Sequence, residues 1–259
     1  MQGDAEILRY LEQQNFPAER CAHTEPVFMH EEQPVLITNF VDGTKPKGSA
    51  KAFYFAGVLL GRLHTLPLAS GDMSRKGGAW HHLSVQGGTR EEIEAAQSFV
   101  ISSEKNVSME DRSHYETLLN ELRQLDDLHD MPQALIHPDF VPSNMIKADV
   151  GNWAVIDWSG TGRGPRIFSL GFLLWAAGFR GNLQCVDAVI TGYRNYINLE
   201  IDELKRLSNA IGFRPLIWDC WAFCMGRKTL VEAAQGVSVT QEITKTITNR
   251  SEQAFKNLT

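Results

Sequence analysis

The pattern of apolar and polar residues in the middle of the chain predicts two short buried strands. Residues 134–136 and 153–156 are continuous apolar runs, each too short for a typical helix. Pro138, Pro142 and Gly151 interrupt the chain between them. Because short apolar runs bounded by turn-forming residues are typical of buried strands, we expect the two runs to pair with each other as a hairpin-like unit.

Polar side chains follow each of these predicted strands. His137 and Asp139 follow the first, Asn144 comes five residues after the aspartate, and Asp157 follows the second. Paired strands would bring the two carboxylates and the amide to one end of the unit. Their oxygens are hard ligands that suit Mg²⁺ holding substrate phosphates. Two buried strands with solvated turn residues would explain part of the pattern, but four spaced polar positions with apolar flanks favour a site.

Apolar residues at helical spacing predict that much of the remaining chain is helical. A short amphipathic helix over residues 4–14 is followed by two strands, 26–29 and 34–41, with a polar turn between them. The further helices are expected over residues 51–66, 89–100, 108–129, 167–179, 184–199, 202–210 and 215–234, followed by an amphipathic tail. Residues 69–88 and the glycine-rich stretch 159–166 are expected to be loops, and the second is expected to be flexible enough to move over a ligand.

Composition and charge exclude some classes of protein. The 259 residues suffice for one large domain or two modest ones. A formal charge of −6 argues against a nucleic-acid partner. The longest apolar stretch, residues 168–179, is too short to span a bilayer, and residues 1–6 do not read as a signal peptide, so we expect no membrane partner and a cytoplasmic location. Cys220 and Cys224 are expected to be buried thiols rather than metal ligands.

The order of the polar residues resembles the catalytic and metal-binding segments of kinases. Residues 137–144 read HPDFVPSN, and residues 156–158 read IDW where protein kinases have Asp-Phe-Gly. These variants resemble the aminoglycoside phosphotransferase family, which also includes choline-kinase-like small-molecule kinases. The resemblance implies an α+β, protein-kinase-like fold. Residues 1–43 would form a partial N-terminal lobe (helix plus β-hairpin) with the hinge, and residues 44–259 a helical C-terminal lobe.

The resemblance also implies a role for each residue of the motif, with ATP and Mg²⁺ as cofactors. Asp139 would orient the hydroxyl group of a small-molecule acceptor and accept its proton. Asn144 and Asp157 would hold Mg²⁺, which neutralises the charge that develops on the phosphate. His137 would brace the catalytic loop rather than react.

Further residues of the nucleotide site follow from the same resemblance. The adenine base would contact the hinge and the two apolar residues beneath it: Asn39, Phe40, Val41, Ile146 and Ile156. Glu6 stands where the helix glutamate that pairs with the phosphate lysine would be. Only five residues precede Glu6, and the first lysine of the sequence is Lys45, so the sequence shows neither a glycine-rich loop nor a phosphate lysine.

The acceptor side carries less information. The resemblance places much of the acceptor wall in the two helices expected over residues 89–100 and 108–129. Trp218, Asp219 and Trp221 are within reach of such a pocket, although packing in the core is the simpler expectation for them. The sequence does not identify the acceptor.

Three hypotheses about function stay open at this point. The first is an ATP-dependent phosphotransferase acting on a hydroxyl of a small molecule. The second is a non-catalytic, pseudokinase-type protein that binds a nucleotide or ligand, which is favoured by the missing lysine and by Ser169, where the family has an aspartate that braces the catalytic loop. The third is a metal-dependent hydrolase using the same oxygen ligands. Three explanations of the missing elements also stay open: a shortened start of an active kinase, a naturally reduced protein that binds a ligand, and a partner chain that completes the lobe. The exposed edge of the truncated lobe would also favour self-association.

Overall fold

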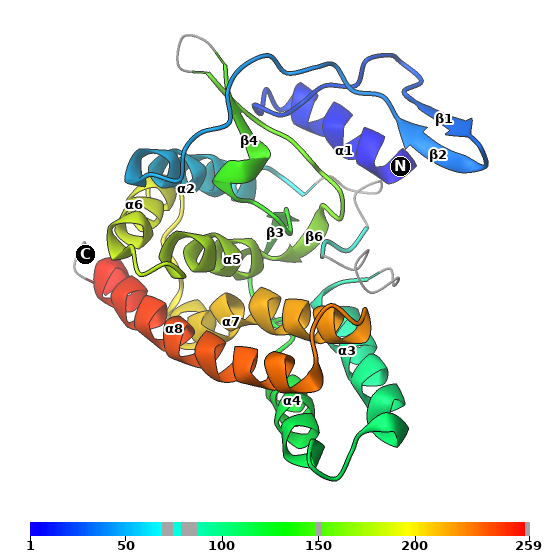
Figure 1. Ribbon diagram of the computed structural model, residues 1–259. Helices are drawn as coiled ribbons and strands as arrows, with labels where there is room; N and C mark the ends of the chain where they lie inside the picture. Colours follow the sequence, from blue (N-terminus) through cyan, green and yellow to red (C-terminus); the bar gives the residue numbers. More distant parts are fainter. Residues whose placement is uncertain (69–74, 79–86, 149–151, 257–259) are drawn as a thin grey trace.

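The structure, a computed structural model, describes residues 1–68, 75–78, 87–148 and 152–256 (Figure 1). It is mostly helical, with three small antiparallel sheets of two strands each in the described part of the chain. The α+β class predicted from the sequence, with a mostly helical C-terminal part, is therefore confirmed. The loop expected over residues 69–88 falls largely outside the described residues.

The N-terminal part consists of one helix and one hairpin. Helix α1 (Gln2–Gln13) buries Ile7, Leu8 and Leu11, as its amphipathic pattern predicts. Strands β1 (Val27–His30) and β2 (Gln33–Leu36) form an antiparallel hairpin. Its two turn residues, Glu31 and Glu32, both have positive φ (47° and 63°), as the tightest hairpin turns require. Strand β2 is shorter than the predicted 34–41, so residues 39–41 connect the lobes as an irregular segment.

Helices make up most of the C-terminal part. They are α2 (Ala50–His64), α3 (Thr89–Ser103), α4 (Arg112–Gln124), α5 (Arg166–Gly178), α6 (Leu183–Tyr193), α7 (Ile201–Cys224) and α8 (Leu230–Lys256). Short 3-10 turns occupy Glu104–Asn106 and Pro142–Asn144. Figure 1 shows α7 and α8 side by side below α5, at the opposite end of the molecule from the β1–β2 hairpin.

The pairing of the central strands differs from the prediction. Strand β3 (Gln133–Ile136) pairs with β6 (Gly162–Pro165), while β4 (Met145–Lys147) pairs with β5 (Trp153–Val155). The two apolar runs therefore do not pair with each other, and residues 162–165 of the glycine-rich stretch are a strand rather than a mobile loop. The prediction failed because glycines usually weaken strands. Here a Cβ atom on Gly164 would lie 2.4 Å from the Ile136 side chain, so only glycine permits this close pairing.

The helix ends near the C-terminus also differ from the prediction. Pro215 lies inside α7 instead of starting a new helix, although it has no N–H to donate to the carbonyl of residue 211. The chain instead breaks at residues 225–229, where Gly226 adopts a φ of 66°. Helix α4 begins at Arg112 rather than at Ser108, whose hydroxyl accepts a hydrogen bond from the Asp111 amide in the preceding turn.

One hydrophobic core joins the N-terminal helix to the C-terminal helices. Apolar residues of α1, α2, α5 and α6 belong to a single buried cluster. At the end of α2, buried His64 lies 3.0 Å from the hydroxyl of Tyr193 on α6. Burial, together with the charge of Arg166, lowers the pKa of His64 to about 3. This histidine is therefore a neutral part of the scaffold.

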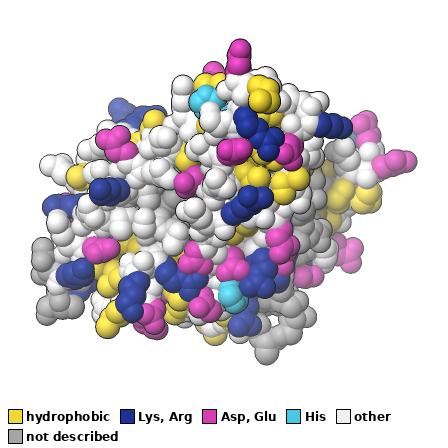
Figure 2. All heavy atoms as spheres, turned by 90° about the horizontal axis from the view of Figure 1, so that it is seen from below, with side chains coloured by type: hydrophobic (Ala, Val, Ile, Leu, Met, Phe, Trp, Pro, Cys, Tyr) yellow, Lys and Arg dark blue, Asp and Glu magenta, His cyan; other side chains and the backbone are white. Residues whose placement is uncertain are grey.

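The surface carries both signs of charge. Figure 2 shows acidic and basic side chains interspersed on the face seen from below. Ion pairs between Arg206 and the carboxylates of Asp126 and Asp130 join α7 to the segment between α4 and β3. None of the helices within the described ranges has the length and apolar character needed to cross a membrane.

Candidate active site

The loop that carries Asp139 is fixed at its first residue by Ser169. The Ser169 hydroxyl of α5 donates to the carbonyl oxygen of His137 (2.7 Å) and accepts from the amide of the same residue (3.0 Å). All these groups are buried, where an unsatisfied amide or carbonyl is costly. Ser169 occupies the position where the resembled family has an aspartate, and its shorter side chain reaches the backbone of the loop directly.

The imidazole of His137 connects this anchor to Asp139. Its Nδ1 atom accepts a hydrogen bond from the Asp139 amide at 3.1 Å. The buried ring packs edge-on against Phe140 and Trp158, at centroid distances of 5.5 and 5.0 Å. Burial lowers the pKa of His137, while the charges of Asp139 and Asp157 act in the opposite direction. A neutral ring accepting at Nδ1 holds the loop in shape without being charged.

Asn144 links Asp139 to the strand that leads to Asp157. Its side-chain Nδ2 donates to the main-chain oxygen of Asp139 (3.1 Å), and its main-chain carbonyl accepts from the Ile156 amide (2.9 Å). Asp157 is exposed and adopts a positive φ of 64°. Its amide donates to a carboxylate oxygen of Glu19 (2.9 Å), which helps to hold this unusual conformation. Hydrogen bonds thus join Asp139 to Asn144, and Asn144 to Ile156, the residue before Asp157.

The donor set of these residues fits a magnesium ion. The hydrogen bond through Nδ2 orients Asn144 so that its amide oxygen is the atom left for a cation, and Asp157 is exposed. No group of three or more His, Cys, Asp or Glu side chains in the described ranges forms a complete metal site. Two oxygen ligands from the chain suit Mg²⁺, which usually takes further oxygens from phosphates and water.

The residues predicted to contact adenine lie around the crossing between the lobes. Asn39 and Phe40 are exposed, and Phe40 is 91% exposed. Val41 and Ile146 are half-buried, as is Ile156. The crossing segment pairs with β4, since the amides of Thr44 and Lys147 donate to each other's carbonyl oxygens (3.0 and 2.9 Å).

Gly43 fits closely over β4. A Cβ atom on it would lie 2.5 Å from the Lys147 carbonyl oxygen and 2.7 Å from the Ile146 side chain. Its φ of 147° also disfavours any other residue. The hinge and Ile146 are thus in direct contact.

Glu6 is not joined to the other predicted residues by any hydrogen bond or ion pair that the described coordinates contain. It lies exposed on α1. The buried acid of this helix is Asp4, which pairs with Arg75 at 2.9 Å. Arg75 in turn donates to the carbonyl of Thr161, four residues after Asp157.

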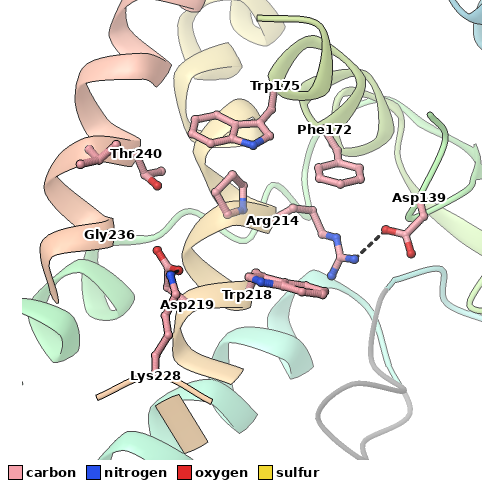
Figure 3. Close-up of a pocket in the computed structure, with 11 residues that line it drawn as sticks. Asp139, Phe172, Trp175, Arg214, Trp218, Asp219, Lys228, Gly236 and Thr240 are labelled. Atoms are coloured by element: carbon pink, nitrogen blue, oxygen red, sulfur yellow. Dashed lines mark hydrogen bonds and ion pairs between the residues drawn. The ribbon is translucent and has the colours of Figure 1, made fainter. Parts of the chain in front are cut away.

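A cavity of about 510 Å³ opens beside Asp139 (Figure 3). Helices α5, α7 and α8 and the turn between the last two supply the rest of its described lining: Phe172, Trp175, Arg214, Pro215, Trp218, Asp219, Lys228, Gly236, Val239 and Thr240. The expectation that α3 and α4 form the acceptor wall is not met within this lining. Trp218 and Asp219, for which core packing was the simpler expectation, instead face the cavity.

Arg214 forms the contact between Asp139 and the cavity. Its Nη2 atom lies 2.7 Å from the Asp139 carboxylate, and its guanidinium lies 5.3 Å from the centroid of Phe172. The side chain is only 3% exposed, and its Nε atom has no hydrogen-bond partner in the described structure. A buried cation held against the proposed base can orient the carboxylate and stabilise negative charge nearby.

A second ion pair lies at another end of the cavity. The Asp219 carboxylate pairs with the ammonium group of Lys228, which comes from the turn between α7 and α8. Asp219 is 6% exposed, and burial raises its pKa while Lys228 opposes the shift. A Cβ atom on Gly236 of α8 would lie 2.4 Å from an Asp219 carboxylate oxygen, so this glycine makes room for the carboxylate.

Sequence reasoning missed Arg214, Phe172, Trp175 and Lys228. Arg214 left a usable signal, since it is a single charge in the apolar run at 210–218 and such charges are rarely buried without a partner. Phe172 and Trp175 left none, because they lie in a helix that is apolar all round and whose pattern does not distinguish a cavity from the core.

The chain was compared with known proteins at the level of sequence and of structure. The model of the phosphotransferase enzyme family, APH, matches residues 1–205. A comparison with curated proteins gave no significant match.

Several solved structures share the fold. The amicoumacin kinase hAmiN, in complex with AMP-PNP, Ca²⁺ and Ami, superposes with a TM-score of 0.61 at 16% identity over 100% of this chain and 80% of that one. An ethanolamine kinase from Plasmodium vivax gives 0.65 at 14% identity, over 96% and 73% of the two chains. The ADP-bound aminoglycoside phosphotransferase APH(2'')-Ib gives 0.60 at 17% identity, over 94% and 82%. With the family model covering more than half of its residues, this chain belongs to the APH phosphotransferase family.

Proposed function

We propose that the chain transfers the γ-phosphoryl group of ATP to a hydroxyl group of a small molecule. The observation that carries the proposal is the position of Asp139. On one side it is hydrogen-bonded through Asn144 to Ile156, the residue before Asp157, and on the other side it lines the 510 Å³ cavity. A carboxylate between a metal–phosphate site and a cavity of this size is suited to activate a bound hydroxyl.

The reaction assigns a role to each group. The oxygen of the acceptor hydroxyl forms a bond to the γ-phosphorus, and the Asp139 carboxylate accepts the proton that this hydroxyl loses. The bond from that phosphorus to the bridging oxygen breaks, and ADP leaves with the electron pair. Arg214 holds Asp139 in position and adds positive charge near the transferring group. The reaction depends on positioning and charge neutralisation, which fixed dipoles and ions provide.

Nucleotide and metal are proposed from the donor set and from the family. Asn144 and Asp157 would hold Mg²⁺, which neutralises phosphate charge when it is bound. AMP-PNP in the amicoumacin kinase and ADP in APH(2'')-Ib support a nucleotide donor for this chain as well. Asn39, Phe40 and Val41 of the hinge, with Ile146 and Ile156 below, would contact the base.

Substitution of the proposed base tests the function. Asp139→Asn keeps the size of the side chain and removes the proton acceptor, so we expect turnover to fall by about 10²- to 10⁴-fold. Binding of Mg-AMP-PNP should change little, and it is measured as the rise in the melting temperature of the protein that this ligand causes. Because the acceptor is unidentified, turnover is measured as ADP release with a panel of hydroxyl compounds and with water as the acceptor.

Three outcomes separate the hypotheses. Retained turnover in Asp139→Asn would contradict the role of this residue. Nucleotide binding by the wild-type chain without ADP release for any compound would favour the non-catalytic alternative. Hydrolysis of a phosphate ester without any nucleotide would favour the metal-dependent hydrolase.

A further inference from the structure

The cavity beside Asp139 is lined mainly by large apolar side chains. Phe172, Trp175 and Trp218 contribute three aromatic rings, and Pro215 and Val239 add aliphatic surface. Trp218 is 47% exposed and Val239 is 56% exposed. Exposed apolar surface that is gathered in one cavity is a feature of ligand sites rather than of ordinary surface.

The charged groups of the cavity balance one another. The acids among the described lining residues are Asp139 and Asp219, and each is paired with a cation, Arg214 or Lys228. The cavity therefore has no excess of negative charge in its described lining. A ligand with several positive charges would lose its hydration on entering the cavity, and the described lining offers no carboxylates in excess to pair with those charges. Binding of such a ligand is therefore unfavourable.

Figure 3 shows how these groups are arranged. The indoles of Trp175 and Trp218 lie on opposite sides of the cavity, and Asp139 and Asp219 lie at opposite ends. Arg214 and Asp219 are five residues apart on α7, or about 7.5 Å along the helix axis. A ligand that spans the cavity would therefore contact an ion pair at each end and aromatic rings between them.

Of the two ion pairs, the one at Asp219 is the pair whose cation a ligand can replace. Asp219 is buried, and its carboxylate lies so close to Gly236 that a Cβ atom there would collide with it. A buried carboxylate is costly without a cation beside it. Its partner Lys228 has a 35% exposed side chain on the turn between two helices. The ammonium of this flexible side chain can return to water when another cation takes its place.

We infer that the acceptor is a hydroxyl compound with a planar apolar body and a single ammonium group. Its body lies between Trp175 and Trp218, its ammonium replaces that of Lys228 at Asp219, and its hydroxyl meets Asp139. This inference rests on the proposed function, since it takes the cavity as the acceptor site. The volume of about 510 Å³ lies in the range of about 300–1,000 Å³ that is usual for drug-sized ligands, far larger than a two-carbon amino alcohol needs.

Binding of four simple probes to the full chain tests this inference by calorimetry, without nucleotide. The probe 2-amino-1-phenylethanol has a ring, a hydroxyl and one amine. Ethanolamine lacks the ring, 1-phenylethanol lacks the amine, and kanamycin is a polycationic aminoglycoside. We expect 2-amino-1-phenylethanol to bind at least about tenfold more tightly than each of the others, because only it satisfies the rings and Asp219 together.

Two variants assign the affinity to named residues. Trp218→Ala should weaken both phenyl probes by about tenfold and leave ethanolamine unchanged. Asp219→Asn should weaken the two amino alcohols and leave 1-phenylethanol unchanged. Asp187→Asn is the matched control, because Asp187 is also paired with a cation, Arg250, but lies outside the cavity.

The inference is overturned if ethanolamine or kanamycin binds as tightly as 2-amino-1-phenylethanol, or if Trp218→Ala leaves all four affinities unchanged. It is also overturned if Asp219→Asn and Asp187→Asn behave alike. Binding is measured apart from phosphoryl transfer. The expected probe ranking without ADP release would therefore contradict the proposed function alone, and ADP release with a different ranking would contradict this inference alone.

Discussion

The proposed nucleotide side and the proposed acceptor side of Asp139 are built in different ways. On the nucleotide side, short strands and turns hold Asn144 and Asp157 through hydrogen bonds that involve the main chain, and Asp157 is exposed while Asn144 is half-buried. On the acceptor side, long helices present two ion pairs, Arg214 with Asp139 and Asp219 with Lys228, among aromatic rings. The first arrangement depends on backbone geometry, and the second on which side chains three helices carry.

This difference explains why one side can be read from sequence and the other cannot. The Asn144 side chain is hydrogen-bonded to the main chain of Asp139, five residues before it, so the spacing of these two residues is itself a signal. The residues that line the cavity are distributed from Asp139 to Thr240, and no spacing rule connects them. We expect this difference between the two sides if the members of a family share one phosphate donor and differ in their acceptors.

The largest effect that distinguishes the two sides is expected from Asp157→Asn. Removal of the negative charge that faces the proposed Mg²⁺ should lower turnover by at least about 10²-fold, because the metal neutralises phosphate charge. Binding of 2-amino-1-phenylethanol should be unchanged. ADP release and calorimetry measure the two quantities, with Asp202→Asn, a surface aspartate paired with Lys205, as the control. Equal loss of acceptor binding would show that the two sides are not independent.

A smaller effect is expected from Arg214, which lies at the boundary of the two sides. Arg214→Met keeps the volume of this buried residue and removes the cation from Asp139, so we expect kcat to fall by about 10- to 100-fold. The KM for ATP should be unchanged, and Arg214→Lys should restore part of kcat. Thermal unfolding of each variant checks that it is folded. A positioning role would be contradicted if Arg214→Lys had the same low kcat as Arg214→Met. It would also be contradicted if the KM for ATP rose as much as kcat fell.

The smallest effect concerns the scaffold that both sides share. Burial and Arg166 lower the pKa of His64 to about 3 in the folded chain, whereas an unfolded histidine takes up a proton near pH 6.5. Between these values the unfolded chain binds more protons, so the stability due to His64 is complete above about pH 6.5 and falls as the pH drops. The loss approaches about 1.4 kcal/mol per pH unit.

Urea unfolding between pH 7.5 and 4.5 measures this slope. We expect His64→Gln to flatten it, since glutamine does not titrate and can still reach the Tyr193 hydroxyl. The buried, neutral His137 contributes in the same direction, so some slope is expected to persist. An identical pH dependence in the wild type and His64→Gln would refute the assignment.

Several sequence predictions held because local patterns decided them. The apolar stripe of residues 4–14 predicted α1, and the polar turn at Glu31 and Glu32 predicted the β1–β2 hairpin. Other predictions failed where distant contacts decided the outcome. The partner of β3 is β6, whose glycines fit against Ile136, and Pro215 is tolerated inside α7. The boundary at residues 43 and 44 and the hypothesis of self-association stay predictions.

The sequence by itself determined the mostly helical fold class, through local periodicity, and the family, through the motif at residues 137–158. The roles of Asp139, Asn144 and Asp157 stay predictions from that motif. Only the tertiary structure decided that Ser169 anchors the loop, that Arg214 pairs with Asp139, and that Asp219 faces a cavity. The physical reason is that these contacts join residues 9 to 75 positions apart, and such pairs arise from the way in which helices pack, which no local pattern records.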